Sequence, residues 1–561
     1  MSVTQKMANM QSEKKSVANV QIPPETEHAA PLQKKKTYSA SLLFCFHFHR
    51  AQRRAAAQAM AMESAGPGAN RTKLAAPDIY EEALPPLPAV ATAEATDPEP
   101  AITETSQEPP SGAEENGGEE ELLDRISRLP DDILGEIISH LPVMEGARTQ
   151  ILAPRWRHLW RAAPLNLDYR VLPAADRSLL SARDVLVGAI LAAHHGTGRR
   201  LCLPARHLEC RADAVDAWLR SHSLDNLHEL EFYVCRATHS WPILIFEHLV
   251  PPPASIFRCS STLRAVTISN CHLLEDTVQT IRFPHLRKLA LINVRIKEVS
   301  LHNIISGCPG LECLLLSSIS RIRCLRINSP TLISIGIRSS SRELIIEDAP
   351  SLQRLLHLEM HMEMHISVIS APKLETLGCI CEQYNDRRVM IGSTIIQGLR
   401  AVSLTTVVRT VKILAIHMVC FDQDMVIDLL RCFPCLEKLY AKEKSESWES
   451  ITVHHKSWNL LTSLDIRLRT IVLRRYRRTR LEVNFATFFV LNARMLDSMR
   501  LEVESCDYNE HFFAEQHRLL QMEKRASRRA RLCFTTGCRH DVSGIRHVDD
   551  LDSTDPFACG C

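Results

Sequence analysis

Cysteine and histidine are the side chains in this sequence most able to bind a metal. Cys432 and Cys435 form a C-x-x-C pair, while Cys45, His47 and His49 alternate with other residues near the start. A structural zinc site needs four such ligands, and neither group has the additional ligands at a suitable spacing. We therefore expect no metal site and no cofactor.

Catalytic motifs are absent from the sequence. It contains no glycine-rich phosphate loop, no G-x-S-x-G elbow and no H-E-x-x-H pair, and its 25 histidines are scattered rather than grouped with carboxylates. The chain is therefore expected to be non-catalytic.

Arginines concentrate around Tyr476, at positions 467, 469, 474, 475, 477, 478 and 480. Such a cluster could bind RNA through phosphate contacts and stacking. It alternates with apolar residues such as Leu468 and Val472, which is typical of a strand with one solvated face. We favour the strand, so nucleic acid is not an expected partner. The basic segment 524–531 fits either a nuclear-localisation patch or a solvated helix surface.

The overall composition excludes several classes of protein. The 561 residues include 67 Lys and Arg against 65 Asp and Glu, a net charge of +2, which provides no field that would hold the whole molecule on nucleic acid or an anionic membrane. The 19 cysteines lie singly among apolar residues, without a secretory signal, which favours reduced thiols in the cytoplasm or nucleus. The apolar run 41–48 is too short to span a membrane, and no membrane anchor is expected.

The first 121 residues are expected to form a disordered N-terminal extension. Residues 63–121 are rich in Ala, Pro, Glu, Thr and Gly and have an acidic end at 114–121. Such a composition offers too little apolar surface to offset the entropy of ordering. Residues 1–62 are interpreted as unstructured, with a transit peptide as the alternative.

Periodic apolar residues begin at Leu122. Aliphatic residues three or four apart between Ile126 and Leu141 predict an amphipathic helix, with Pro130 in its first turn and Pro142 after its end. A second helix is expected at 143–152 and a third from Pro154. Three short helices make a very small core, so this module is expected to need a partner that covers its remaining aliphatic surface.

The residues 124–134, 137–142, 148–149 and 155–160 resemble the F-box of plant F-box proteins. The resemblance implies binding to a Skp-type adaptor and, through it, to cullin and RING subunits. Trp156 and Trp160 are expected either in the module's own core or on its adaptor surface. The implied adaptor-binding residues are Leu129, Pro130, Ile133, Leu134, Ile137, Leu141, Pro142, Val143, Trp156 and Trp160.

A leucine-rich pattern recurs downstream of the F-box-like segment. Its leading leucines are 23, 25, 21, 20, 22 and 25 residues apart, within the range of leucine-rich repeats, in which each repeat adds one strand to a parallel sheet. The period breaks after Leu399, where an irregularity or a short hairpin is expected, and it resumes near Val411. These leading residues are Leu263, Leu286, Leu311, Leu332, Leu352, Leu374 and Leu399.

Two further segments support a family resemblance. Residues 283–286 and 307–314 are similar to the irregular repeats that follow plant F-boxes, and residues 481–499 resemble the FBD region, in which a helix ends in Asn-Ala-Arg and leads into a last strand. The apolar spacing from Phe485 to Leu496 predicts a helix that caps the repeat end. The chain is thus identified as a member of the plant F-box/FBD/leucine-rich-repeat family.

The expected fold is α/β: a three-helix F-box, then an irregular leucine-rich-repeat solenoid with a parallel concave sheet, then an FBD-like C-terminal cap. The expected boundaries are 122–165 for the F-box, 166–460 for the repeats, 461–531 for the FBD-like region and 532–561 for a tail.

The expected function is substrate recognition within an SCF-type ubiquitin ligase, with an unknown protein substrate. The alternative is a leucine-rich-repeat scaffold or RNA-binding protein without a ligase role. The residues expected to contact substrate alternate with inward leucines and are Arg287, Lys288, Glu312 and Lys373.

Overall fold

The computed structural model describes eleven stretches of the chain. They are residues 126, 128–173, 180–234, 249–279, 281–320, 322–339, 341–358, 364–382, 388–443, 465–536 and 545–558. The expected disordered extension, 1–121, and the group of Cys45, His47 and His49 lie outside these residues.

Three short helices begin the described chain: α4 (Asp131–Ser139), α5 (Val143–Arg148) and α6 (Trp156–Ala162), with a 3-10 turn (Thr149–Ile151) after α5. Pro130 and Pro142 immediately precede α4 and α5, where a missing N–H is tolerated. The Arg155 side chain donates to the Asp131 carboxylate at 2.7 Å and to the Leu129 carbonyl at 2.6 Å, so it ties α6 to the start of α4.

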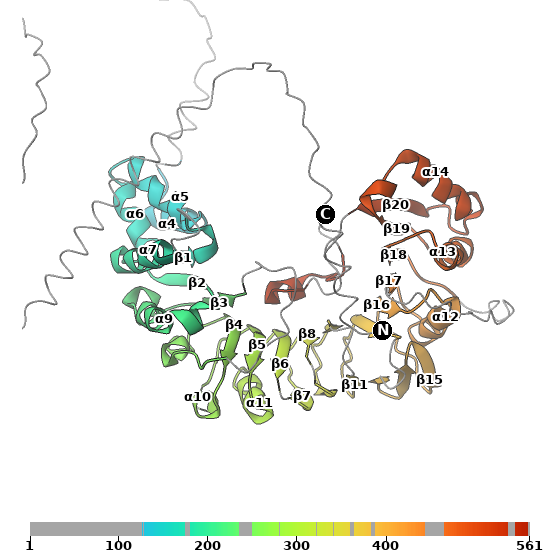
Figure 1. Cartoon of the computed structure of the whole chain (residues 1–561), viewed down its shortest axis with the longest axis horizontal. Coiled ribbons are helices and arrows are strands. Elements are labelled where there is room, and N and C mark those ends of the chain that lie inside the picture. Colours follow the sequence, from blue (N-terminus) through green and yellow to red (C-terminus); the bar gives the residue numbers. More distant parts are fainter. Residues whose placement is uncertain are drawn as a thin grey trace, which may run out of the picture. The chain divides into compact units, whose positions relative to one another are not determined.

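A fourteen-stranded parallel sheet follows, and its strands pair almost entirely in chain order (Figure 1). The strands are β1 (Leu165–Asp168), β2 (Gly198–Pro204), β3 (Glu229–Tyr233), β4 (Ala265–His272), β5 (Lys288–Arg295), β6 (Cys313–Ser320), β8 (Ser334–Arg338), β10 (Arg354–His357), β12 (Thr376–Cys381), β16 (Ile413–Met418), β17 (Lys438–Glu443), β18 (Thr470–Arg474), β19 (Ser498–Val503) and β20 (Arg531–Thr536).

Helices and a second sheet return the chain between these strands. The helices are α7 (Leu180–Ala193), α8 (His207–Cys210), α9 (Ala212–Leu219), α10 (Glu275–Gln279), α11 (Glu298–Ser306), α12 (Gln423–Cys432), α13 (Arg480–Asn492) and α14 (Glu510–Leu519). The six-stranded second sheet contains β7 (Cys324–Asn328), β9 (Glu343–Asp348), β11 (His365–Val368), β13 (Arg388–Ile391), β14 (Thr394–Gln397) and β15 (Arg400–Leu404).

The length of each repeat decides which element returns the chain. The starts of β5 and β6 are 25 residues apart, as are those of β16 and β17, and both connections contain a helix. From β6 through β12 the starts are 20 to 22 residues apart, and each connection contains a strand of the second sheet. A strand covers more than twice the length per residue of a helix, so shorter repeats return in extended form.

The repeat expected to begin at Leu399 is not present in the main sheet. Gly398 and Leu399 form the turn between β14 and β15, where both residues have positive φ. The strands β13, β14 and β15 pair antiparallel, and the main sheet resumes with β16. The irregularity therefore consists of an antiparallel meander inserted before Val411.

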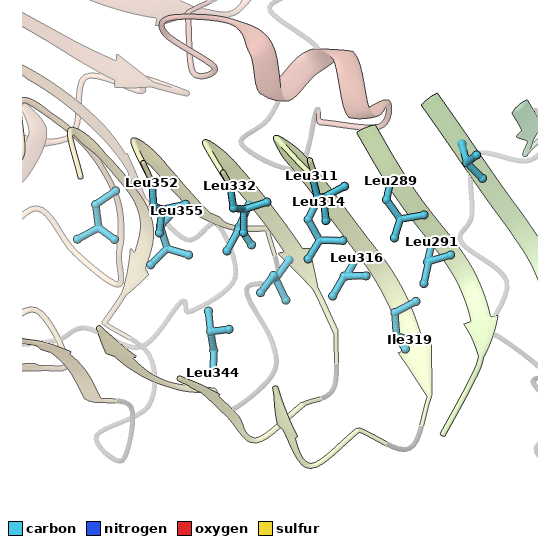
Figure 2. Close-up of a cluster of buried hydrophobic side chains, with 14 of the residues drawn as sticks. Leu289, Leu291, Leu311, Leu314, Leu316, Ile319, Leu332, Leu344, Leu352 and Leu355 are labelled. Atoms are coloured by element: carbon cyan, nitrogen blue, oxygen red, sulfur yellow. The ribbon is translucent and has the colours of Figure 1, made fainter. Parts of the chain in front are cut away.

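One hydrophobic core extends from the first helices to the end of the repeats. Leu134 in α4, Leu314 in β6 and Phe489 in α13 belong to the same buried cluster. The inward residues expected from the sequence, Leu286, Leu289, Leu311 and Leu374, are at most 1% exposed. Figure 2 shows such leucines from successive strands lying side by side.

The helix α13 packs on the distal part of the sheet. The hydroxyl of Thr479 accepts from the Glu482 N–H, and the Glu482 carboxylate accepts in return from the Thr479 N–H, which forms a capping box. Phe485, Phe488 and Phe489 are buried. The sheet continues past this helix through β19 and β20, and residues 545–558, expected as part of a tail, are folded against the sheet.

We predict that the buried leucine ladder carries much of the stability. Replacing Leu314, which is fully buried in β6, with Ala should lower the free energy of unfolding by about 2–5 kcal/mol. Replacing Leu404, which is 43% exposed on β15, with Ala should lower the free energy of unfolding by less than about 1 kcal/mol. Chemical denaturation of both variants checks this, and equal losses would contradict the assigned packing.

Candidate functional site

An exposed aliphatic face begins on α4 and continues at Leu141, two residues beyond the end of the helix. Ile133, Ile137 and Leu141 follow one another at intervals of four residues and are 49%, 45% and 37% exposed. Leu134 and Ile138, which lie about 100° further around the same helix, are buried in the core. The helix therefore carries one broad apolar stripe, and the described chain covers only part of it.

The other expected adaptor residues divide into exposed and buried positions. Pro130 and Pro142 are exposed, Leu129 and Trp156 are half-buried, and Leu134, Val143 and Trp160 are buried. The indole of Trp160 meets the His194 ring edge to face, with centroids 5.3 Å apart. Trp160 is therefore buried in the core that the helical module shares with the first repeat.

Three exposed aliphatic residues were not among the expected adaptor-binding set. Ile126 is 54% exposed, and Ile151 and Leu152, after α5, are 72% and 69% exposed. The sequence signal for Ile151 and Leu152 was that two aliphatic residues stand side by side outside the helical apolar pattern.

Polar contacts join the helical module to the first repeat. Arg199 on β2 forms a bidentate pair with Glu136 on α4, at 2.8 and 2.9 Å, which holds the pKa of that carboxyl below its usual range. The Asn166 amide donates to the Ser139 carbonyl at 2.7 Å. The module is consequently fixed to the sheet by both core packing and hydrogen bonds.

Three of the four expected substrate residues line one groove at the amino ends of the strands. Arg287, Glu312 and Lys373 border a groove of about 820 Å³, together with Arg264 and Gln353. Arg287 and Glu312 form an ion pair of 3.2 Å across neighbouring repeats. Both precede their strands, where main-chain hydrogen bonds link successive repeats.

Lys288 lies outside this groove, and its ammonium is paired within the chain. It begins β5, and its ammonium pairs with Asp549, at 2.7 Å, and with Asp552. Residue 288 alternates with the inward Leu289, so its side chain projects from the other face of the sheet. We call this the open face, and we call residues 545–558, which cover part of it, the strap.

Charged groups fasten the beginning of the strap. His547 lies 3.1 Å from Asp549 and 3.7 Å from Glu231 on β3, and these two carboxylates raise the pKa of His547 to about 9. Burial opposes ionisation of Glu231, but His547 and Arg170 together lower its pKa to about 2. The hydrogen bond from His547 likewise lowers the pKa of Asp549.

The C-x-x-C pair and the arginine-rich segment lie in the repeat and FBD-like regions of the structure. Cys432 is buried at the end of α12, and Cys435 is half-buried. In the basic segment, 470–474 form β18, and the guanidinium of Arg478 lies over the ring of Phe512. Within the described ranges, no three or more His, Cys, Asp or Glu side chains are grouped as metal ligands, and no helix has the length and apolarity needed to cross a membrane.

Three protein families match parts of this chain. The F-box domain matches residues 126–168, the LRR repeats of the FBD-associated F-box protein At5g56370 match residues 215–441, and the FBD matches residues 460–501. The matched ranges follow the order of the helical module, the repeats and the α13 region.

Curated proteins from Arabidopsis thaliana are similar to parts of this chain. The F-box/FBD/LRR-repeat protein At1g13570 is 28% identical over 252 residues, which are 44% of this chain and 56% of that protein. The F-box/LRR-repeat protein At3g26922 is 31% identical over 191 residues, 34% of this chain and 58% of that protein. The chain therefore spans somewhat more than half the length of these relatives.

We predict that docking of the strap depends on pH through His547. The pKa of His547 is raised from 6.5 to about 9, so protonated His547 stabilises the docked strap. This stabilisation is complete below pH 6.5 and is lost as the pH rises through about 9. The contributions of Glu231 and Asp549 are lost only in acid, since their pKa values are lowered. The raised pKa values of Lys288 and Tyr440 leave both groups unchanged between pH 6 and 9.5.

Hydrogen exchange of the strap amides, corrected for intrinsic rates, measures this dependence. Protection should fall on the order of ten-fold or more between pH 6 and 9.5, and His547→Gln should remove most of that change. A His547→Gln variant that retains the full pH dependence would contradict the assignment.

Proposed function

We propose that this chain, which belongs to the plant F-box/FBD/leucine-rich-repeat family, acts as the substrate-recognition subunit of an SCF-type ubiquitin ligase. In this proposal the helical module binds a Skp-type adaptor, the adaptor joins it to cullin and RING subunits, and the repeats bind the protein substrate. The chain is an F-box protein, and proteins of this kind are typically non-catalytic adaptors. Ubiquitin transfer would be performed by the other subunits, in the cytoplasm, the nucleus or both.

The observation that carries the proposal is the exposed aliphatic face of α4. Ile133, Ile137 and Leu141 would lose a large exposed apolar area on contact with an adaptor, and each buried CH₂ group contributes about 0.8 kcal/mol. Exposed Ile151 and Leu152 provide further apolar surface in the same module. A protein surface with this density of exposed aliphatic residues indicates an interface.

The proposed mechanism is proximity. A substrate held on the repeats would be kept at high effective concentration beside the conjugating enzyme, so an intermolecular reaction becomes effectively intramolecular. The bidentate pair of Glu136 and Arg199 and the shared core support this role, because they hold the adaptor-binding helix in a fixed position relative to the sheet. The groove beside Arg287, Glu312 and Lys373 is one proposed substrate surface.

We predict that charge on the α4 face abolishes adaptor binding. The double substitution Ile133→Asp and Ile137→Asp places two carboxylates where apolar contacts should form, at exposed positions that the fold does not require. The affinity for a recombinant plant Skp adaptor should fall at least about a hundred-fold, because two apolar contacts are replaced by desolvated charges. Co-purification of the adaptor with the variant checks this loss.

A matched control is Val299→Asp on α11, which is 63% exposed and far along the chain from the helical module. This variant should bind the adaptor as the original chain does. Retention of adaptor binding by the Ile133→Asp and Ile137→Asp variant, with an unchanged thermal transition, would refute the proposed docking face.

A further inference from the structure

The open face presents two regular rows of side chains across the repeats. Lys288, Cys313, Ser334 and Arg354 occupy one register, and they are followed in register by Thr376, Ile413 and Lys438. Two residues further along each strand, Ala290, Leu315, Gly336, Leu356 and Gly378 form a second row. A polar row therefore runs beside an apolar row, perpendicular to the strands.

The strap places its carboxylates on the polar row. Asp549, Asp552 and Asp555 are three residues apart, and each meets a donor from the sheet. Lys288 pairs with the first two, and the Lys438 ammonium and the Tyr440 hydroxyl lie 3.0 and 2.8 Å from Asp555. Burial and the nearby Asp555 carboxylate raise the pKa of Tyr440, so its hydroxyl remains a donor. Charge complementarity thus extends over the length of the strap.

Cations on the sheet also bind carbonyl groups of the strap. The guanidinium of Arg354 donates to the Leu551 carbonyl at 2.9 Å, and that of Arg474 donates to the Phe557 carbonyl at 2.6 Å. Such contacts recognise the peptide backbone whatever its side chain at that position. Specificity must therefore come from the carboxylates and from the apolar anchors.

Two glycines in the apolar row make room for the anchors. A Cβ atom at Gly336 would lie 2.9 Å from the Leu551 side chain, and one at Gly378 would lie 2.8 Å from the ring of Phe557. Leu551 and Phe557 are at most 1% exposed. The ring of Phe557 also packs against Tyr440, with centroids 5.5 Å apart. The sheet thus provides shaped depressions for one aliphatic and one aromatic side chain.

The strap lies on the sheet without becoming part of it. Its main-chain hydrogen bonds from Asp550 N–H to the His547 carbonyl and from Ala558 N–H to the Asp555 carbonyl stay within the strap. Its one regular element is a short 3-10 turn, Val548–Asp552, closed by a capping box between His547 and Asp550. Each strand from β5 to β18 is paired on both sides by other strands, so the sheet's ladder does not depend on the strap.

We infer that the open face between β5 and β18 is a binding site for acidic protein segments with an aliphatic and an aromatic anchor, and that residues 545–558 are its internal occupant. A substrate of this chemistry competes with the strap for the same two rows. That such a segment belongs to a ubiquitylation substrate rests on the proposed function. The inference adds the class of protein that the repeats select.

An occupant within the same chain sets a threshold for substrates. A tethered segment acts at an effective concentration in the millimolar range, so even weak intrinsic affinity keeps the site filled. A competing segment must therefore bind more tightly or be presented together with a second contact, such as the groove at the amino ends of the strands. Release of the strap raises the apparent affinity for every competitor by the same factor.

Fluorescence anisotropy with a labelled synthetic peptide tests the site on the full chain. The peptide has the sequence of residues 545–558, and its control carries Leu551→Asp and Phe557→Asp. Two variants of the chain release the strap: Leu551→Asp with Phe557→Asp removes the anchors, and Asp549→Lys with Asp552→Lys leaves them in place. At least one released variant should bind the peptide about ten-fold or more tightly than the original chain, and the control peptide should bind to none of them.

A charge exchange locates the peptide on the polar row. Added to the anchor-released chain, Lys288→Glu should weaken peptide binding about ten-fold or more, because Asp549 and Asp552 of the peptide then face a carboxylate. A peptide with Asp549→Lys and Asp552→Lys should restore most of the lost affinity. Absence of this rescue would show that the peptide binds elsewhere and would overturn the inference.

Three results would contradict the inference directly. The site is refuted if folded released variants fail to bind the peptide, or if they bind it no better than the original chain. Loss of the cooperative thermal transition in both variants would show that the strap is a fixed part of the core. Adaptor co-purification is measured on the same samples: adaptor loss with peptide binding retained would count against the proposed function alone, and the reverse pattern against this inference alone.

Discussion

Parallel pairing of fourteen strands is the constraint on which the other features of this chain depend. Residues alternate between two faces in a strand, so one register decides both what fills the core and what is displayed. Leu289 and Leu314 point inward, and the neighbouring Lys288 and Cys313 then necessarily face the strap. The same register places Arg287 and Glu312 at the amino ends of the strands.

The parts of the fold that repeat locally could be predicted from the sequence. Leucines at intervals of 20–25 residues predict the buried ladder, and the apolar spacing from Ile126 to Leu141 predicts α4. The second sheet was not predicted. The repeats that return through one of its strands differ from those that return through a helix chiefly in the length of the connection. The segment at Gly398 and Leu399 matches a leucine pattern, but both residues have positive φ and form a two-residue hairpin turn.

Contacts between distant segments explain what sequence reasoning missed at the site. Lys288 and Asp549 are 261 positions apart, and neither has a local feature that identifies the other. The strap carries only a weak signal, the apolar residues Val548, Leu551 and Phe557 among aspartates, which equally describes an exposed tail. Trp160 could be placed in the core only once its contact with the ring of His194 was known.

The continuous core between α4 and the sheet is central to the proposed mechanism, since a substrate held on the repeats is positioned only if the F-box module cannot pivot. Native-state hydrogen exchange of Ile138 in α4 and Leu201 in β2 measures this most directly, because both residues are buried in elements joined by Glu136 and Arg199. The account predicts opening free energies that agree within about 1 kcal/mol, as for one cooperative unit. An opening free energy for Ile138 several kcal/mol below that for Leu201 would show that the module moves independently of the sheet. That result would contradict the proposed rigid connection.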